Sequence, residues 1–274
     1  MDYRDADDEC FAIVEAHGSE VFGAGVTSKL PETMRALAMF CAKGNSLKTA
    51  MFDAIDSDNP YAFRVLYRCF CEHLLKFMYL WVRSTKEKTD AVGTEYYSYC
   101  GAIEAFEYGA ALKAAEALIG NKATGDFTDA VATLYPKSSA LTRKELEAFS
   151  GKFKYRTILR YLAEPDIGFV VREHPFLAAI VPAYALYSSF VHGGPYSELE
   201  MATYAEPKAL ADCERDAGVM VMMNATMFML TAAAVAAAKG EKVAPVAGMV
   251  RDVLRRFSEA NDEEDEDVHA SAAT

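Results

Sequence analysis

The 274-residue sequence lacks most patterns that identify a chemistry directly. It has no apolar–polar alternation typical of a β-strand and no internal repeat. The motifs G-x-x-x-x-G-K-[ST], H-E-x-x-H and G-x-S-x-G are absent, so nothing points to a P-loop NTPase, an HExxH metalloprotease or an α/β-hydrolase. With no strand pattern, the sequence predicts an all-α protein.

Metal and disulfide patterns are missing too. The six cysteines form no C-x-x-C pair, and we interpret them as free thiols of a cytoplasmic protein. His17, His73 and His174 are scattered, and His269 lies in the tail, so we predict no metal and no cofactor. The acidic N-terminus has no apolar run, which argues against a signal peptide.

A surplus of positive charge is also absent. The net charge of −12 comes mainly from the two ends, because residues 1–9 carry five acids and residues 258–274 carry seven. The rest is close to neutral and does not indicate general nucleic-acid affinity.

The most informative stretch is an apolar helix predicted over residues 61–83. Its apolar side chains recur every three or four residues, and they are Phe63, Leu66, Tyr67, Phe70, Leu74, Phe77, Met78 and Trp81. The other side carries further apolar residues, Val65, Cys69, Leu75 and Tyr79, and Arg68 and Glu72 lie among them. A helix that is apolar nearly all round belongs in a core, so the Arg68–Glu72 pair should be at least partly buried. It is either a core salt bridge or part of a functional site.

Periodicity and breakers predict further helices at 5–21, 31–42, 46–55, 91–119, 141–162, 176–190, 217–238 and 245–257. Thr142 and Glu145 have capping-box spacing, and 197–205 is expected to be a loop. No linker divides the chain. We predict one multi-helix bundle over residues 1–258 and a disordered acidic tail over 259–274.

The segment 217–238 has no charged residue and is long enough to span a bilayer. Its many alanines, together with Asn224, Thr226 and Thr231, make it only weakly apolar. We interpret it as a buried core helix and expect no stable membrane insertion. Membrane association through this segment is the alternative.

A second candidate site lies at the end of the 176–190 helix. Tyr184, Ser188 and His192 are spaced by four and share one helical face, which could bind phosphate or transfer a proton. The same residues could instead join two helices by hydrogen bonds, with His192 capping the helix end.

These two stretches resemble a family of uncharacterised prokaryotic helical proteins of the HEPN-like group. The resemblance rests on Arg68-x-x-x-Glu72, the tyrosine-rich segment 95–99, and Tyr184-x-x-x-Ser188-x-x-x-His192, in order from about residue 47 to 199. It implies a HEPN-like bundle, and many members of that group dimerise. They are often nucleases, toxins or defence proteins, which implies a link to defence or stress response.

One departure concerns the nuclease members, which carry an arginine shortly before the histidine. Here the corresponding positions hold Ala185, Leu186 and Tyr187. We therefore interpret the chain as a homodimeric binding or assembly module. The alternative is a metal-independent ribonuclease or toxin-like enzyme acting on RNA, with His192 as acid or base and Arg68 stabilising phosphate charge, assisted by Glu72, Ser188 and Tyr184.

Overall fold

The computed structural model describes residues 1–120, 127–167, 176–204, 207–239 and 241–272, and these residues contain helices and no strands. The helices are α1 (Tyr3–Val26), α2 (Pro31–Asp56), α3 (Pro60–Glu87), α4 (Ala91–Thr94), the π-helix η1 (Glu95–Cys100), α5 (Gly101–Leu118), α6 (Thr128–Leu134), η2 (Pro136–Ala140), α7 (Arg143–Gly151), α8 (Tyr155–Leu162), α10 (Phe176–His192), α11 (Pro195–Met201), α12 (Pro207–Lys239), η3 (Glu241–Val243) and α13 (Ala244–Ala272). The predicted all-α bundle is confirmed.

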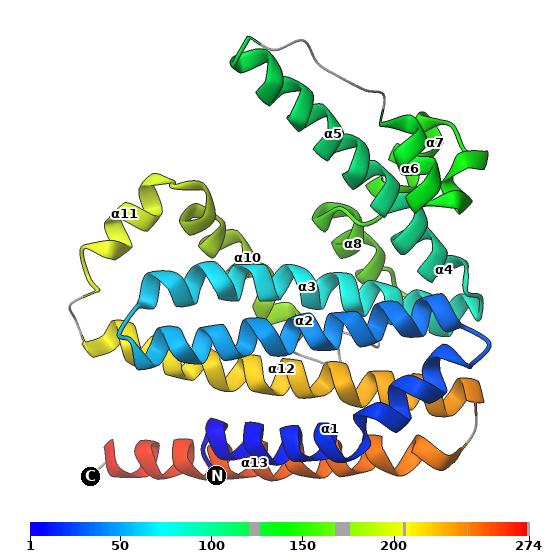
Figure 1. Ribbon diagram of the computed structural model, residues 1–274. Helices are drawn as coiled ribbons and strands as arrows, with labels where there is room; N and C mark the ends of the chain where they lie inside the picture. Colours follow the sequence, from blue (N-terminus) through cyan, green and yellow to red (C-terminus); the bar gives the residue numbers. More distant parts are fainter. Residues whose placement is uncertain (121–126, 168–175, 205–206, 240, 273–274) are drawn as a thin grey trace.

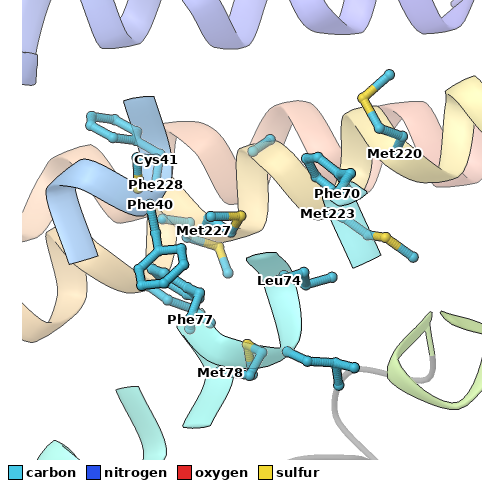
Figure 2. Close-up of a cluster of buried hydrophobic side chains, with 14 of the residues drawn as sticks. Phe40, Cys41, Phe70, Leu74, Phe77, Met78, Met220, Met223, Met227 and Phe228 are labelled. Atoms are coloured by element: carbon cyan, nitrogen blue, oxygen red, sulfur yellow. The ribbon is translucent and has the colours of Figure 1, made fainter. Parts of the chain in front are cut away.

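The bundle is built around α12, with α2 and α3 on one side and α1 and α13 on the other (Figure 1). The other side of α3 packs against α10 and α8. Figure 2 shows the apolar side chains between α2, α3 and α12, among them Phe40, Phe70, Phe77, Met223 and Met227. All five are at most 1% exposed. Methionine adapts to irregular space, which suits a core assembled from three long helices.

Helix α12 contains the segment predicted to be a core helix. It is long and apolar enough to cross a membrane by length and composition, and 67% of its most apolar window is buried inside the protein. Core helices of soluble proteins pass the same test. The indole N–H of Trp81 donates to the carbonyl of Leu230 at 3.0 Å, which ties α3 to α12.

Several predicted helix ends are confirmed. Pro60 begins α3, and the Asn59 side chain accepts from the N–H of Ala62. Thr142 and Glu145 form the predicted capping box at the start of α7.

Other boundaries were wrong. Residues 31–42 and 46–55 belong to the single helix α2, because Gly44 packs against α12 instead of ending the helix. A Cβ there would lie 2.8 Å from Oδ1 of Asn224. The single helix expected over 91–119 is α4, a π-helix and α5, and 141–162 is divided into α7 and α8. The loop expected at 197–205 is largely the short helix α11.

Helices α5, α6 and α7 form a lobe beside the main bundle (Figure 1). The lobe has its own small core of Ala102, Ile103, Val131 and Leu146. At the other end of the chain, α13 runs to Ala272 and enters the segment predicted to be a disordered tail. Side chains from residue 261 onward lie outside the described residues, so that prediction stays a prediction.

Candidate functional site

Arg68 joins α3 to α10. Its Nε donates to Oγ of Ser188 at 3.1 Å, Nη1 to Glu72 at 2.8 Å, and Nη2 to the hydroxyl of Tyr184 at 2.6 Å. Because α3 and α10 pack along their length, Arg68 and Glu72 on one helix meet Tyr184 and Ser188 on the other. Four of the five predicted site residues therefore form one cluster, which we call the Arg68 cluster.

The guanidinium group of Arg68 is buried among the other residues of the cluster. Arg68 is 8% exposed, and its Cζ lies 3.6 Å from the centre of the Tyr184 ring. Tyr155 of α8 stacks on the same ring, with centroids 3.8 Å apart and planes inclined by 7°. Ser188 accepts from Arg68 and donates to the carbonyl of Tyr184 at 2.7 Å. A guanidinium with this many internal partners acts as a polar connection between helices.

The carboxylate of Glu72 is held in its ionised form. Burial by itself would raise the pKa of Glu72, but the hydrogen bonds and charges of Lys76 and Arg68 outweigh it and lower the pKa to about 2. Lys76 lies 2.8 Å from the second carboxylate oxygen. Glu72 therefore stays charged at neutral pH and is unsuited to act as a general acid.

This low pKa predicts a pH effect on stability. A lowered pKa means that the native state favours the ionised carboxylate, so its stabilising effect is present above about pH 4.5 and is lost as the pH falls toward 2. We expect Glu72→Gln to lose less stability than the wild type in this window, by about 1 kcal/mol, since the side chain is 37% exposed and solvent screens the pair. Urea unfolding at pH 5 and at pH 2.5 measures the loss of unfolding free energy in each protein. Equal losses in the wild type and in Glu72→Gln would contradict this prediction.

The fifth predicted residue, His192, is outside this cluster. It is exposed at the end of α10, and the partners of Arg68 that we describe do not include it. The helix ends there because Gly193 adopts φ +64°, a left-handed conformation that favours glycine, and the N–H of Gly194 returns to the carbonyl of Ser189 at 2.8 Å. The side chain of His192 thus emerges one turn beyond the last contact of α10 with Arg68.

Two further buried arginines of α3 were missed. Arg83 binds Glu87 at 2.6 Å and Glu95 at 2.7 Å, and Lys152 binds Glu95 at 3.0 Å. Arg83-x-x-x-Glu87 repeats the spacing of Arg68-x-x-x-Glu72, so the sequence contained a signal for it. Its contact with Glu95 depends on the break between α4 and α5, which the sequence pattern does not reveal.

Arg64 is the other missed residue. It binds Glu200 of α11 at 3.0 Å, and the rings of Tyr187, Phe190 and Tyr204 surround its guanidinium with centroids 5.1–5.9 Å away. Burial in an aromatic surround favours arginine over lysine because the planar guanidinium stacks on rings. No sequence signal links Arg64 to α11, since that segment was expected to be a loop.

The buried cysteine thiols are not activated as nucleophiles. Burial raises the pKa of Cys71, and likewise of Cys41, to about 12, so both thiols stay protonated at neutral pH. Within the described ranges, no group of three or more His, Cys, Asp or Glu side chains is placed to hold a metal ion.

Comparison with protein-family models, with curated proteins and with solved structures found no match. The fold and the Arg68 cluster define the class of this protein. It is an all-α, multi-helix bundle in which buried arginines connect neighbouring helices.

Proposed function

We propose that this chain is a HEPN-like binding or assembly module that works as a homodimer and has no classical nuclease centre. The observation that carries this proposal is the exposed apolar stripe on α5. Its members are Tyr108, Ala111, Leu112, Ala115 and Leu118 of α5, and Ile119 directly after the helix. Tyr108 is 65% exposed, Leu118 88% and Ile119 73%, which is unusual for large apolar side chains gathered on one element.

The position of α5 makes this stripe available. Its first half packs against α6 and α7. Gly109 lies so close to Phe127 that an added Cβ would be 2.6 Å from the ring. Its second half projects beyond the bundle (Figure 1), and every residue from 110 to 119 except Glu116 is exposed. An isolated helix of this length is marginal in water, so packing against a partner would stabilise it.

A second copy of α5 suits this surface. The small residues Ala111 and Ala115 allow two helix axes to approach closely, as small residues do at other helix–helix contacts. Residues 110–119 carry one Lys and one Glu, so two copies of this segment meet without a surplus of like charge. A contact this short buries less area than a standard interface, and we therefore expect association in about the micromolar range.

Leu112→Glu tests the assembly. We expect the dissociation constant of the dimer to rise at least about tenfold, because each dimer buries two copies of the substituted residue beside apolar neighbours. Sedimentation velocity over a concentration series measures it. Leu134→Glu on α6 is the matched control, since Leu134 is 69% exposed and lies outside the stripe. A wild-type chain that stays monomeric up to 100 µM, far above the expected range, would contradict the proposal.

The same proposal makes an expectation for RNA. Arg68 has internal partners for its donors and lies among residues of α3 and α10, so we expect no cleavage of total RNA or tRNA. His192→Ala is the decisive variant because an exposed side chain can be removed without unfolding the chain. Cleavage by the wild type that disappears in His192→Ala, at unchanged melting temperature, would establish the ribonuclease alternative.

A further inference from the structure

A half-open cavity of about 430 Å³ lies between α3, α8 and α10. Its walls are Leu75 of α3, Leu159 and Leu162 of α8 with Ala163 directly after it, and Leu177, Ala178 and Val181 of α10. All of these side chains are aliphatic. The volume is within the range of small-molecule sites, and an aliphatic wall suits a hydrocarbon group.

The cavity lies next to the Arg68 cluster in the same groove. Leu75 follows Glu72 by one turn of α3, Val181 precedes Tyr184 by one turn of α10, and Leu159 follows Tyr155 by one turn of α8. The stacked rings of Tyr155 and Tyr184 therefore lie one turn from the lining of the cavity, on the side of Arg68. A molecule in the cavity would contact the leucines of α3, α8 and α10.

The wall contains one backbone acceptor that its helix leaves without the usual donor. In an α-helix the carbonyl of Ala178 accepts from the N–H of residue 182, but Pro182 lies inside α10 and has no N–H. The neighbouring carbonyl of Val181 already accepts from the hydroxyl of Tyr155 at 3.4 Å. Ala178 lines the cavity, so its carbonyl is the acceptor there that a donor on a ligand would use.

We propose that this cavity binds a small aliphatic alcohol, with its hydrocarbon against the leucines and its hydroxyl donating to the carbonyl of Ala178. An uncharged donor fits because no carboxylate is among the lining residues to balance a cation. This site is separate from the α5 stripe, so it does not depend on dimer formation.

The test compares 1-octanol with heptyl methyl ether, which has the same heavy atoms and no donor. Calorimetric titration should show saturable binding of both to the wild type, with the alcohol about threefold to tenfold tighter, the effect of one net hydrogen bond. Ala178→Leu fills the wall of the cavity and should weaken both ligands at least about tenfold. Ala179→Leu, at the adjacent exposed position outside the lining, should change neither.

Pro182→Ala tests the carbonyl itself. It restores an N–H for Ala178, so the preference for the alcohol should vanish while the affinity for the ether stays the same. Circular dichroism confirms that each variant is folded. The proposal is overturned if binding does not saturate, if Ala178→Leu behaves like Ala179→Leu, or if Pro182→Ala keeps the preference or weakens the ether.

Discussion

Replacing Arg68 with alanine should lower the free energy of unfolding by about 3 kcal/mol. The substitution removes two hydrogen bonds from α3 to α10 and one within α3, and leaves Glu72, Ser188 and Tyr184 with unmatched polar groups. Breaking a buried ion pair from one side costs about 3–5 kcal/mol. We take the lower end of this range because Glu72 keeps Lys76 and is 37% exposed.

Arg255→Ala is a matched control for this experiment. Arg255 and Glu259 have the same i, i+4 spacing on a helix, but their side chains are 58% and 57% exposed. Removing an exposed pair costs about 0.3–0.5 kcal/mol. Urea unfolding at neutral pH compares the two variants. Similar small losses in both would mean that Arg68 does not connect α3 to α10, and its geometry would then need a functional explanation.

Gly93→Ala should have a comparable or larger effect, with a loss of at least about 3 kcal/mol. Gly93 lies where α4 meets the start of α2, and a Cβ there would lie 2.2 Å from the backbone nitrogen of Thr33 and 2.4 Å from the carbonyl carbon of Glu32. Backbone atoms cannot rotate away as a side chain does, so α4 would have to move.

That movement would break a specific junction. The carboxylate of Asp90 accepts from the N–H groups of Glu32 and Thr33 at 3.1 and 2.8 Å, and the N–H of Gly93 donates to the hydroxyl of Thr33 at 3.2 Å. Asp90 thus caps the first turn of α2 from a distant part of the chain.

Gly23→Ala is the control for this substitution. A Cβ at Gly23 has no neighbour within 4 Å, and the residue is exposed within α1. There alanine should stabilise the protein by about 0.5–1 kcal/mol, because it favours the helix and restricts the unfolded chain. Thermal or urea unfolding measures both variants. A Gly93→Ala protein as stable as the wild type would show that α4 does not pack closely against the start of α2.

The helical class and much of the candidate site could be predicted because they depend on local spacing. The repeat of apolar residues along 61–83 identified α3, and residues four apart on a helix necessarily share a face, which paired Arg68 with Glu72 and Tyr184 with Ser188. The same reasoning added His192 to that face. His192 is nevertheless not with the others, because α10 ends at this residue. The contact of α10 with Arg68 of α3 is at Ser188, one turn before His192.

The sequence by itself determined the all-helical class, the apolar helix over 61–83, and the caps at Asn59 and Thr142. Only the tertiary structure decided which helices meet. Glycines illustrate the difference: Gly44 reads as a helix end, yet it allows α2 to continue close to α12, and Gly93 allows α4 to contact the start of α2. Such contacts join residues far apart in the chain, and their formation depends on the packing of the whole core instead of on local periodicity.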